Sequence, residues 1–318
     1  MSSRPDMQNA KSEFAHRISF AHRISEKKTF SMEEFFEKVY RPLRLRDGSI
    51  NTFKLYRQVI RRFSEYLQRP ATLDDLNDLA VAGFLTHRKD KGRAAWTIAR
   101  ERSMLVALWN LAARRGMVPT FPEVKPCKTP LRVPKAWTVT QVKKLFATAI
   151  SKSGWVGPVR ANVWWPALLA VLWETGERIS AVMAAKKADF QEPWLTIQPE
   201  DRKGGLAART YRLSLATCHR LNLASEHHEP QLFYWPRCHA SLWSAWRRLV
   251  QAAGLPTGRG AGFHMIRRSA ASHLAAQGGD ATKFLGHRSP ELAGRWYVDP
   301  TIAEAGRPQP VDLLPRID

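Results

Sequence analysis

The run FHMIRRSAASHLAAQGG, residues 263–279, says more about the fold than any other stretch of this 318-residue chain. Small and apolar residues recur in a helical pattern and two glycines close it, which predicts a helix with a C-terminal glycine stop. His264 and Arg267 are three positions apart, so their side chains lie on one face of that helix. This pair indicates an anion site, with a purely structural histidine as the alternative.

A second stretch, LGHRSPELAGRWYVDP (residues 285–300), contains the last tyrosine of the chain. Ser-Pro-Glu at 289–291 supplies a cap, a first-turn proline and a first-turn acid. A final helix is therefore predicted to begin there and to carry Tyr297. Taken alone, Tyr297 beside Trp296 is typical of aromatic packing. Trp296 is expected to keep that packing role, whereas the role of Tyr297 depends on the residues that accompany it.

Three more cationic side chains occupy turns of the same half. Arg178, in TGERIS, lies at a turn into a helix, and His287 lies just before the final helix. Lys203, in RKGG, lies beside a glycine turn between strands predicted at 194–198 and 210–215. Two arginines, a lysine and two histidines that converge on a tyrosine suit phosphoryl transfer. Arginines bind phosphate oxygens, a lysine or histidine moves a proton, and the tyrosine forms the covalent bond. Fixed cations neutralise the developing charge, so no metal ion or other cofactor is expected.

In this order the residues resemble the hallmark set of the tyrosine recombinases, the phage-integrase family. No single piece is specific, but five pieces in order on matching elements are. The resemblance covers roughly residues 31–300, and residues 264–279 resemble the family's second conserved box almost throughout. The catalytic residues that it implies, with the last as nucleophile, are Arg178, Lys203, His264, Arg267, His287 and Tyr297.

The resemblance implies an activity, an assembly and a fold. Members cleave one strand of each duplex and conserve the energy in a 3′-phosphotyrosyl bond, which the 5′-hydroxyl of a partner strand attacks. Two rounds pass through a Holliday junction in a homo-tetramer, whereas the free protein is expected to be a monomer or weak oligomer. The chain is thus expected to be a site-specific recombinase or integrase of a mobile element. Its expected fold is mainly α with a small β-sheet: an N-terminal helical SAM-like core-binding domain and a C-terminal α+β catalytic domain.

Three departures from the family pattern keep other functions open. Ala181 stands where members often have an acid, three positions after the first arginine. The interval from Gly279 to His287 is shorter than usual, and the interval from His287 to Tyr297 is one residue longer than the commonest spacing. The alternatives are a DNA-binding or architectural protein of this fold without catalysis, and a type IB-like topoisomerase.

The N-terminal half is predicted to be a compact bundle of about four helices. Ser31 is a cap before MEEFFEKVYRPL, and residues 52–67 form an amphipathic helix. Thr72 is expected to cap a third helix, and Gly116 to close a fourth at residues 94–116.

Proline spacing divides the chain into parts. Five prolines between residues 119 and 134 predict a stiff linker, because proline cannot continue a helix. The expected parts are a basic N-terminal arm (1–30), the core-binding domain (31–118), the linker (119–137), the catalytic domain (138–300) and a tail (301–318). The arm contains the near-repeat FAHRISFAHRIS, and the apolar residues of the tail are expected to pack into an adjacent protomer.

Both halves of the chain are strongly basic. Lys and Arg total 50 against 28 Asp and Glu, and residues 1–130 and 131–318 each hold 25 basic and 14 acidic side chains, a charge of +11 each. This even surplus indicates that both halves contact a polyanion, and double-stranded DNA is the expected partner. Merely solvated basic faces are the alternative. The expected DNA contacts, through phosphate neutralisation, are Lys54, Arg57, Arg61, Arg62, Arg93, Arg100, Arg102, Arg202 and Arg268.

Composition also argues against several classes of protein. The three cysteines are far apart without a C-x-x-C motif, which favours a reducing compartment and no disulfide framework. There is no apolar run of about 20 residues and no signal-peptide core, so we expect no membrane span and a cytoplasmic location. Cys-His and His-His pairs at 218–219, 227–228 and 238–239 invite a zinc site, but their spacing matches no zinc pattern.

Overall fold

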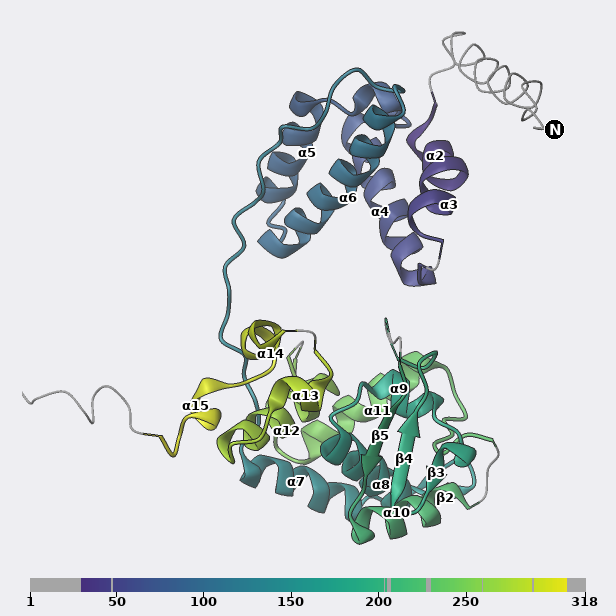
Figure 1. The fold of residues 1–318 in the computed structure, drawn as a ribbon, viewed down its shortest axis with the longest axis vertical. Coiled ribbons are helices and arrows are strands. Elements are labelled where there is room, and N and C mark those ends of the chain that lie inside the picture. The colour runs from purple at the N-terminus through teal and green to yellow at the C-terminus, as the bar shows by residue number, and fades with distance from the viewer. Residues whose placement is uncertain are drawn as a thin grey trace, which may run out of the picture. The chain divides into compact units, whose positions relative to one another are not determined.

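The computed structural model of the protein describes residues 30–46, 48–202, 204, 207–226, 230–258, 260–287 and 289–307. The chain divides into two compact units, Met1–Pro130 and Leu131–Asp318 (Figure 1). Lys203, the near-repeat of the arm, the pair at 227–228 and the apolar tail residues from 308 onward lie outside the described residues. None of the described helices combines the length and apolar character that a membrane crossing requires.

The N-terminal unit is a helical bundle around one aromatic core. Ser31 begins its first helical run as predicted, because its hydroxyl accepts a hydrogen bond from the Glu34 N–H at 3.1 Å. Phe35, Phe63 and Trp109 are fully buried in the core. The elements are α2 (Met32–Phe35), η1 (Phe36–Tyr40), α3 (Arg41–Arg44), α4 (Ile50–Leu67), η2 (Leu73–Asp75), α5 (Asp78–Asp90) and α6 (Ala95–Arg114).

The helix predicted to begin at Thr72 begins later. Thr72 caps only the short turn η2, where its N–H and hydroxyl both donate to the Asp75 carboxylate, at 2.8 and 3.0 Å. Asn77 provides a second cap, accepting the Ala80 N–H at 2.9 Å, and α5 starts there. Two capping residues five positions apart compete for one helix start, and the sequence pattern did not separate them. The stop at Gly116 is confirmed, with a φ of 66° after α6.

The C-terminal unit is mainly helical with small antiparallel sheets, which confirms the predicted fold class. The strands of the larger sheet run in the order β3-β4-β5, with Ile197 opposite Arg209. The helices are α7 (Val139–Ile150), α8 (Ala161–Thr175), α9 (Ile179–Ala184), α10 (Leu215–Ser225), α11 (His239–Ala252), α12 (His264–Ala276), α13 (Ala281–Leu285), α14 (Pro290–Trp296) and α15 (Pro300–Ala303). The strands are β1 (Trp155–Val156), β2 (Val159–Arg160), β3 (Phe190–Gln191), β4 (Trp194–Ile197) and β5 (Arg209–Arg212).

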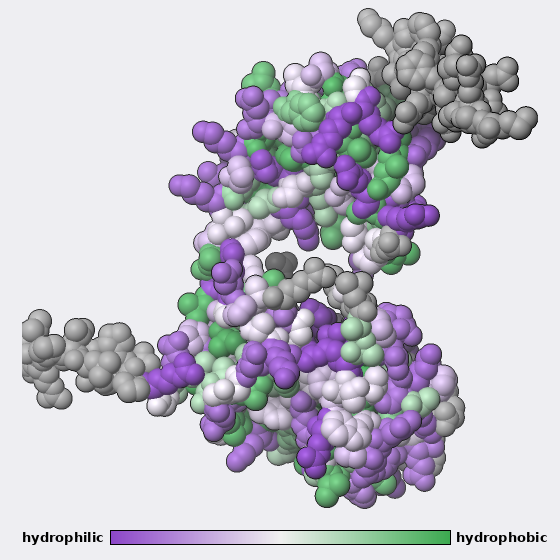
Figure 2. Space-filling model, in the orientation of Figure 1, coloured by the Kyte–Doolittle hydropathy of each residue, from purple (hydrophilic) through white to green (hydrophobic). Residues whose placement is uncertain are grey.

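Helix α8 forms the centre of this unit. Most of its residues are buried, and it packs against α7, α10 and α12 (Figure 1). Trp164 and Trp165 on α8 belong to a cluster of aromatic rings that includes Trp246 and Phe263. The rings of Trp246 and Phe263 stack with their centres 4.2 Å apart. Trp246 is thus a core residue, and Trp243 is partly buried against the same core. On the face drawn in Figure 2, hydrophilic residues dominate the surface of both units, with apolar residues scattered among them.

Three details differ from the sequence prediction. The strand expected at 210–215 ends at Arg212, because Ser214 accepts the Thr217 N–H at 3.2 Å and caps α10. The final predicted helix begins at the Ser289 cap, but it ends at Trp296, so Tyr297 is its C-cap residue. The packing role predicted for Trp296 is wrong, since the indole is 40% exposed.

Candidate active site

The first arginine of the predicted set stands at the break between α8 and α9. Gly176 ends α8 in the left-handed conformation, with a φ of 61°, which favours glycine. Space is restricted as well, because a Cβ at this position would overlap the Phe284 ring. The chain turns sharply there, and Arg178 becomes the half-buried N-cap residue of α9.

Arg267, on α12, is the buried centre of the site, with an exposed fraction of 1%. Its guanidinium donates to the carbonyl oxygen of Gly176 and, at 2.7 Å, to that of Leu285. One of its nitrogens also lies 3.4 Å from Nε2 of His287. Burial, and then the charge of Arg178, lower the pKa of Arg267. A cation held against two carbonyls is preorganised for an anion, because it need not reorient when the anion arrives.

His287 lies between Arg267 and Tyr297. Its ring centre is 4.6 Å from that of Tyr297, with 61° between the ring planes. Burial, followed by the charges of Arg267, Arg178 and Arg209, lowers the pKa of His287 to about 4. The imidazole is therefore neutral at pH 7. Its Nδ1 is buried and has no hydrogen-bond partner among the described residues, so it can bind a group that enters the site.

Tyr297 faces these two side chains and is held by its backbone. The Cζ atom of Arg267 lies 5.2 Å from the centre of the tyrosine ring. The Tyr297 N–H donates to the Ala293 carbonyl at 2.9 Å. The Ser272 hydroxyl, on α12, accepts the Asp299 N–H at 2.8 Å and donates to the Arg268 carbonyl at 2.8 Å, with the Tyr297 carbonyl 3.4 Å away. The helix that carries His264 and Arg267 therefore also positions the tyrosine.

Asp299 fastens the tyrosine segment to the start of the unit. Its carboxylate accepts the Ala136 N–H at 2.9 Å, and the N–H and hydroxyl of Thr301 at 3.1 and 2.7 Å. Burial would raise the pKa of this carboxyl, but the bonds from Thr301 and Ala136 outweigh burial and lower it. An ionised, nearly fully buried carboxylate thus holds residues that are 163 positions apart.

His264 lies on the open side of the site. It is exposed at the first position of α12. Together with Arg268, Leu292, Trp296 and Tyr297 it lines an open cavity of about 350 Å³. This cavity gives a substrate access to the tyrosine from solvent. The structure therefore gathers five of the six predicted residues, and Lys203 is the one outside the described residues.

Comparison with known proteins places the chain in a family. The sequence family described as "Phage integrase family" matches residues 136–304, and "Phage integrase, N-terminal SAM-like domain" matches residues 36–116. The chain belongs to the phage integrase family. It is 27% identical to the tyrosine recombinase XerC of Agrobacterium fabrum over 272 residues, 77% of this chain and 82% of the relative. It is also 27% identical to the tyrosine recombinase XerD of Mycobacterium tuberculosis over 272 residues, 77% and 86% of the two chains.

Solved structures of phage integrases share the fold. A lambda integrase dimer bound to a COC′ core site matches with a TM-score of 0.68 and 19% identity, over 94% of this chain and 84% of that chain. A lambda integrase tetramer bound to a Holliday junction matches with a TM-score of 0.66 and 19% identity, over 91% and 90%. At this identity the likeness shows the fold: a helical SAM-like domain and an integrase catalytic domain.

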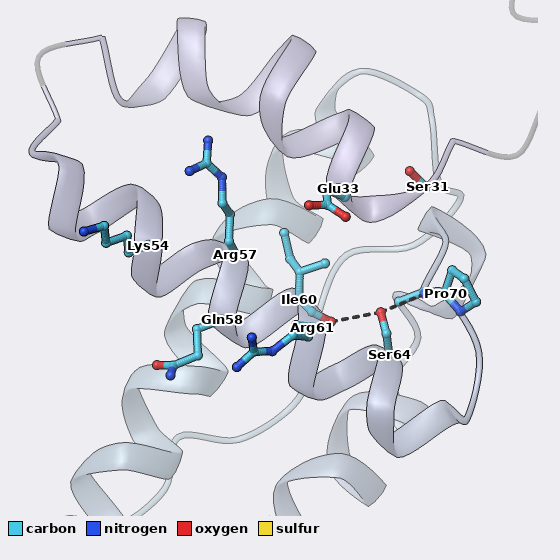
Figure 3. A pocket seen from close by; sticks show the side chains of 10 residues that line it. Ser31, Glu33, Lys54, Arg57, Gln58, Ile60, Arg61, Ser64 and Pro70 are labelled. Atoms are coloured by element: carbon cyan, nitrogen blue, oxygen red, sulfur yellow. Dashed lines mark hydrogen bonds between the residues drawn. The ribbon is translucent and has the colours of Figure 1, made fainter.

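Three expected DNA contacts line one groove of the N-terminal unit. Lys54, Arg57 and Arg61 all come from α4 and border an open groove of about 610 Å³ (Figure 3). Arg57 pairs with Glu37 at 2.6 Å, and Arg61 pairs with Glu65 at 3.5 Å. Such exposed pairs contribute little stability. Both arginines can therefore exchange their carboxylate for a phosphate.

Two other expected contacts are committed to the fold of the same unit. Arg62 donates to Glu101 at 2.8 Å, and this carboxylate is fully buried. Arg102 donates to the Val124 carbonyl at 2.9 Å. Breaking the first pair would leave a buried charge without one of its partners, which is strongly unfavourable. These two arginines therefore have structural roles that the helical pattern did not reveal.

The remaining four expected contacts divide between the two units. Arg93 and Arg100 are exposed, with no side-chain partner among the described residues. The Arg202 guanidinium is turned inward to Glu177 at 2.8 Å, and its side chain is only 10% exposed. Arg268 donates to a backbone carbonyl at 2.6 Å and borders the cavity at the tyrosine. In the catalytic unit these cations thus belong to the site rather than to an outer surface.

Two residues that position the tyrosine, Ser272 and Asp299, were not predicted from the sequence. The available signals were a serine within an apolar helix and an aspartate before Pro300, which is a typical helix cap. Asp299 does cap α15, accepting the Thr301 N–H. Its bond to Ala136 has no local signal, because the two residues meet only in the folded unit.

Proposed function

We propose that this chain is a site-specific DNA recombinase in which Tyr297 is the nucleophile. The observation that supports it most is the placement of the Tyr297 ring against His287, 4.6 Å between ring centres, and against buried Arg267. Attack on a phosphodiester needs a nucleophile, fixed positive charge and a proton acceptor in one place. Tyr297, Arg267 and His264 would supply them at this end of α12.

In the proposed cleavage step, the Tyr297 hydroxyl oxygen attacks the scissile phosphorus. Arg178 and Arg267 bind the non-bridging oxygens, and His264 accepts the tyrosine proton. The P–O5′ bond breaks, and Lys203 gives a proton to the departing 5′ oxygen. A 3′-phosphotyrosyl bond remains, and the 5′-hydroxyl of another strand attacks it in the reverse reaction. The step uses no metal ion or other cofactor.

His287 is proposed to bind the phosphate through a ring nitrogen. In the free protein its pKa is about 4 because burial and three arginines disfavour a further positive charge. A phosphate anion beside the ring reverses part of that effect and raises the pKa. The imidazole then donates a hydrogen bond to the phosphate when the negative charge is greatest.

The same proposal covers the partner and the assembly. Residues 31–118 would hold the duplex as a core-binding domain, residues 138–300 would carry out the chemistry, and residues 119–137 would link them. The charge of +11 on each half of the chain supports contact of both parts with DNA. The lambda integrase tetramer on a Holliday junction supports a homo-tetramer during strand exchange. A mobile element is the expected setting.

The test is Tyr297→Phe on nicked suicide substrates made from the DNA that flanks the gene. The native protein is expected to form a covalent adduct that survives denaturing gel electrophoresis. The variant is expected to bind the same DNA and to form no adduct, because phenylalanine lacks the attacking oxygen. An undiminished adduct in the variant would exclude Tyr297 as nucleophile. Salt-sensitive binding by the native protein with no adduct would favour a DNA-binding role alone, and relaxation of any supercoiled plasmid would favour a topoisomerase.

A further inference from the structure

One acid is buried inside the cationic site. Glu177, the residue before Arg178, has an exposed fraction of 1%. Taking a carboxylate out of water is costly unless its oxygens are well bonded and its charge is balanced. The position of Glu177 therefore requires specific partners.

Both carboxylate oxygens have partners, and these come from three segments. One oxygen accepts Nε–H of Arg202 at 2.8 Å and the Tyr211 hydroxyl at 2.6 Å. The other accepts the Arg178 N–H at 3.2 Å. Arg202 lies in the loop that joins β4 to β5, and Tyr211 lies on β5. A single side chain thus ties the turn of Arg178 to the loop of the β4–β5 hairpin and to β5.

Glu177 is also the counter-charge of the cluster. Burial would raise the pKa of its carboxyl, but the bond from Tyr211 and the charges of Arg202 and Arg267 outweigh burial and lower it. Glu177 is therefore ionised, and it favours the charged form of Arg267 in return. Glu177 thus balances part of the positive charge of the arginines around it.

The hairpin has a second anchor on the other side of the site. Arg209 of β5 donates to the carbonyls of Lys283 and Phe284, at 2.6 and 3.1 Å. At Gly286 a Cβ would lie 2.6 Å from one nitrogen of Arg209 and 2.9 Å from one of Arg202, so glycine leaves room for both. Two arginines, Arg202 and Arg209, thus hold the hairpin in place, and Glu177 is the acidic partner of Arg202.

We propose that Glu177 is a positioning residue that fixes the β4–β5 hairpin so that its loop delivers a proton to the leaving 5′ oxygen. This rests on the proposed function, in which Lys203, next to Arg202 in the sequence, is the proton donor. When the P–O5′ bond breaks, its electron pair stays on the 5′ oxygen and takes that proton. Glu177 touches neither DNA nor the reacting atoms, and it acts through Arg202 and Tyr211.

The experiment compares Glu177→Gln with the native protein on two suicide substrates. They differ in one atom, with oxygen or sulfur at the bridging 5′ position of the scissile phosphate. A thiolate leaves without protonation, so a misplaced proton donor slows cleavage of the oxygen substrate much more than that of the sulfur substrate. Single-turnover adduct formation is expected to fall about tenfold or more with oxygen and by less than about threefold with sulfur. DNA affinity is expected to stay within about twofold, because Glu177 is buried.

The matched control is Glu174→Gln, at the end of α8 and three residues before Glu177. Glu174 accepts the hydroxyls of Ser214 and Thr217, each at 2.6 Å, outside the arginine cluster. The Glu174→Gln variant is expected to form the adduct at the native rate on both substrates. Where Glu177→Gln fails to fold, Tyr211→Phe removes one bond to Glu177 and is expected to show the same oxygen-specific loss, to a smaller degree. Equal losses on both substrates, or no loss with oxygen, would overturn the proposal. Failure of the proposed function looks different, since the native protein itself would then form no adduct on either substrate.

Discussion

Lowering the pH from 7 to 5 is expected to destabilise the C-terminal unit through His287. The folded-state pKa of His287 is about 4, against an unfolded value of about 6.5. The folded state binds the proton less readily than the unfolded state, so acid favours unfolding. The stabilisation is complete above the unfolded pKa and is lost as the pH falls toward the folded pKa. At about 1.36 kcal/mol per pKa unit the whole effect is about 3 kcal/mol, of which about 2 kcal/mol is lost between pH 7 and pH 5.

Denaturant unfolding of the native protein and of His287→Gln at both pH values measures this effect. Glutamine cannot gain a proton, so the variant lacks the part of the pH dependence that belongs to His287. Carboxylates such as Asp299 titrate in both proteins and cancel in the difference. The free energy of unfolding is expected to fall by about 2 kcal/mol more in the native protein than in the variant. Equal losses in the two proteins, or an NMR titration of the His287 ring near 6.5, would refute the argument from burial and neighbouring arginines.

Two further substitutions test the steric and hydrogen-bonding arguments. Gly176→Ala is expected to destabilise the unit by about 2–4 kcal/mol, because it combines a left-handed φ with overlap on a ring. Gly254→Ala, at a φ of 64° in open space, is expected to lose only about 1–2 kcal/mol in urea unfolding, and equal losses would contradict the steric part. Ser272→Ala leaves the buried N–H of Asp299 without its acceptor, so a loss of about 1–3 kcal/mol and slower adduct formation are expected. Ser103→Ala, which removes an exposed hydroxyl on α6, is expected to change neither measurement, and a native adduct rate in the Ser272 variant would count against its positioning role.

The sequence predicted the helices best where the signal is local. Ser31 and Ser289 each cap a helix as expected, because a cap needs only its own side chain and an N–H three residues ahead. The start of α5 was misplaced because Thr72 and Asn77 both satisfy that local rule. Competition between two valid caps is decided by packing, which the pattern does not contain.

The residue types of the candidate site and their order were predicted from the sequence. The residues that hold them in place were not. The mutual approach of Arg267, His287 and Tyr297 follows from that order once the fold is known. The burial of Glu177 does not, because an acid beside an arginine in sequence is usually a solvated pair. The exposure of Trp296 was also missed, since α14 is a short helix that buries only Ala293. The helical pattern of so short a segment gives little information about which face is covered.

The hydrogen bond from the Ala136 N–H to the Asp299 carboxylate joins the first residues of the C-terminal unit to the segment that follows Tyr297. The segment that enters the unit is thereby fastened two residues after Tyr297. A pull on the incoming chain reaches the tyrosine segment through this bond and reaches α12 through the Trp137 N–H, which donates to the Ser269 hydroxyl at 2.8 Å, without passing along the 163 positions between Ala136 and Asp299. The end of the linker and the tyrosine segment are thus joined by a connection that is far shorter than the covalent chain between them.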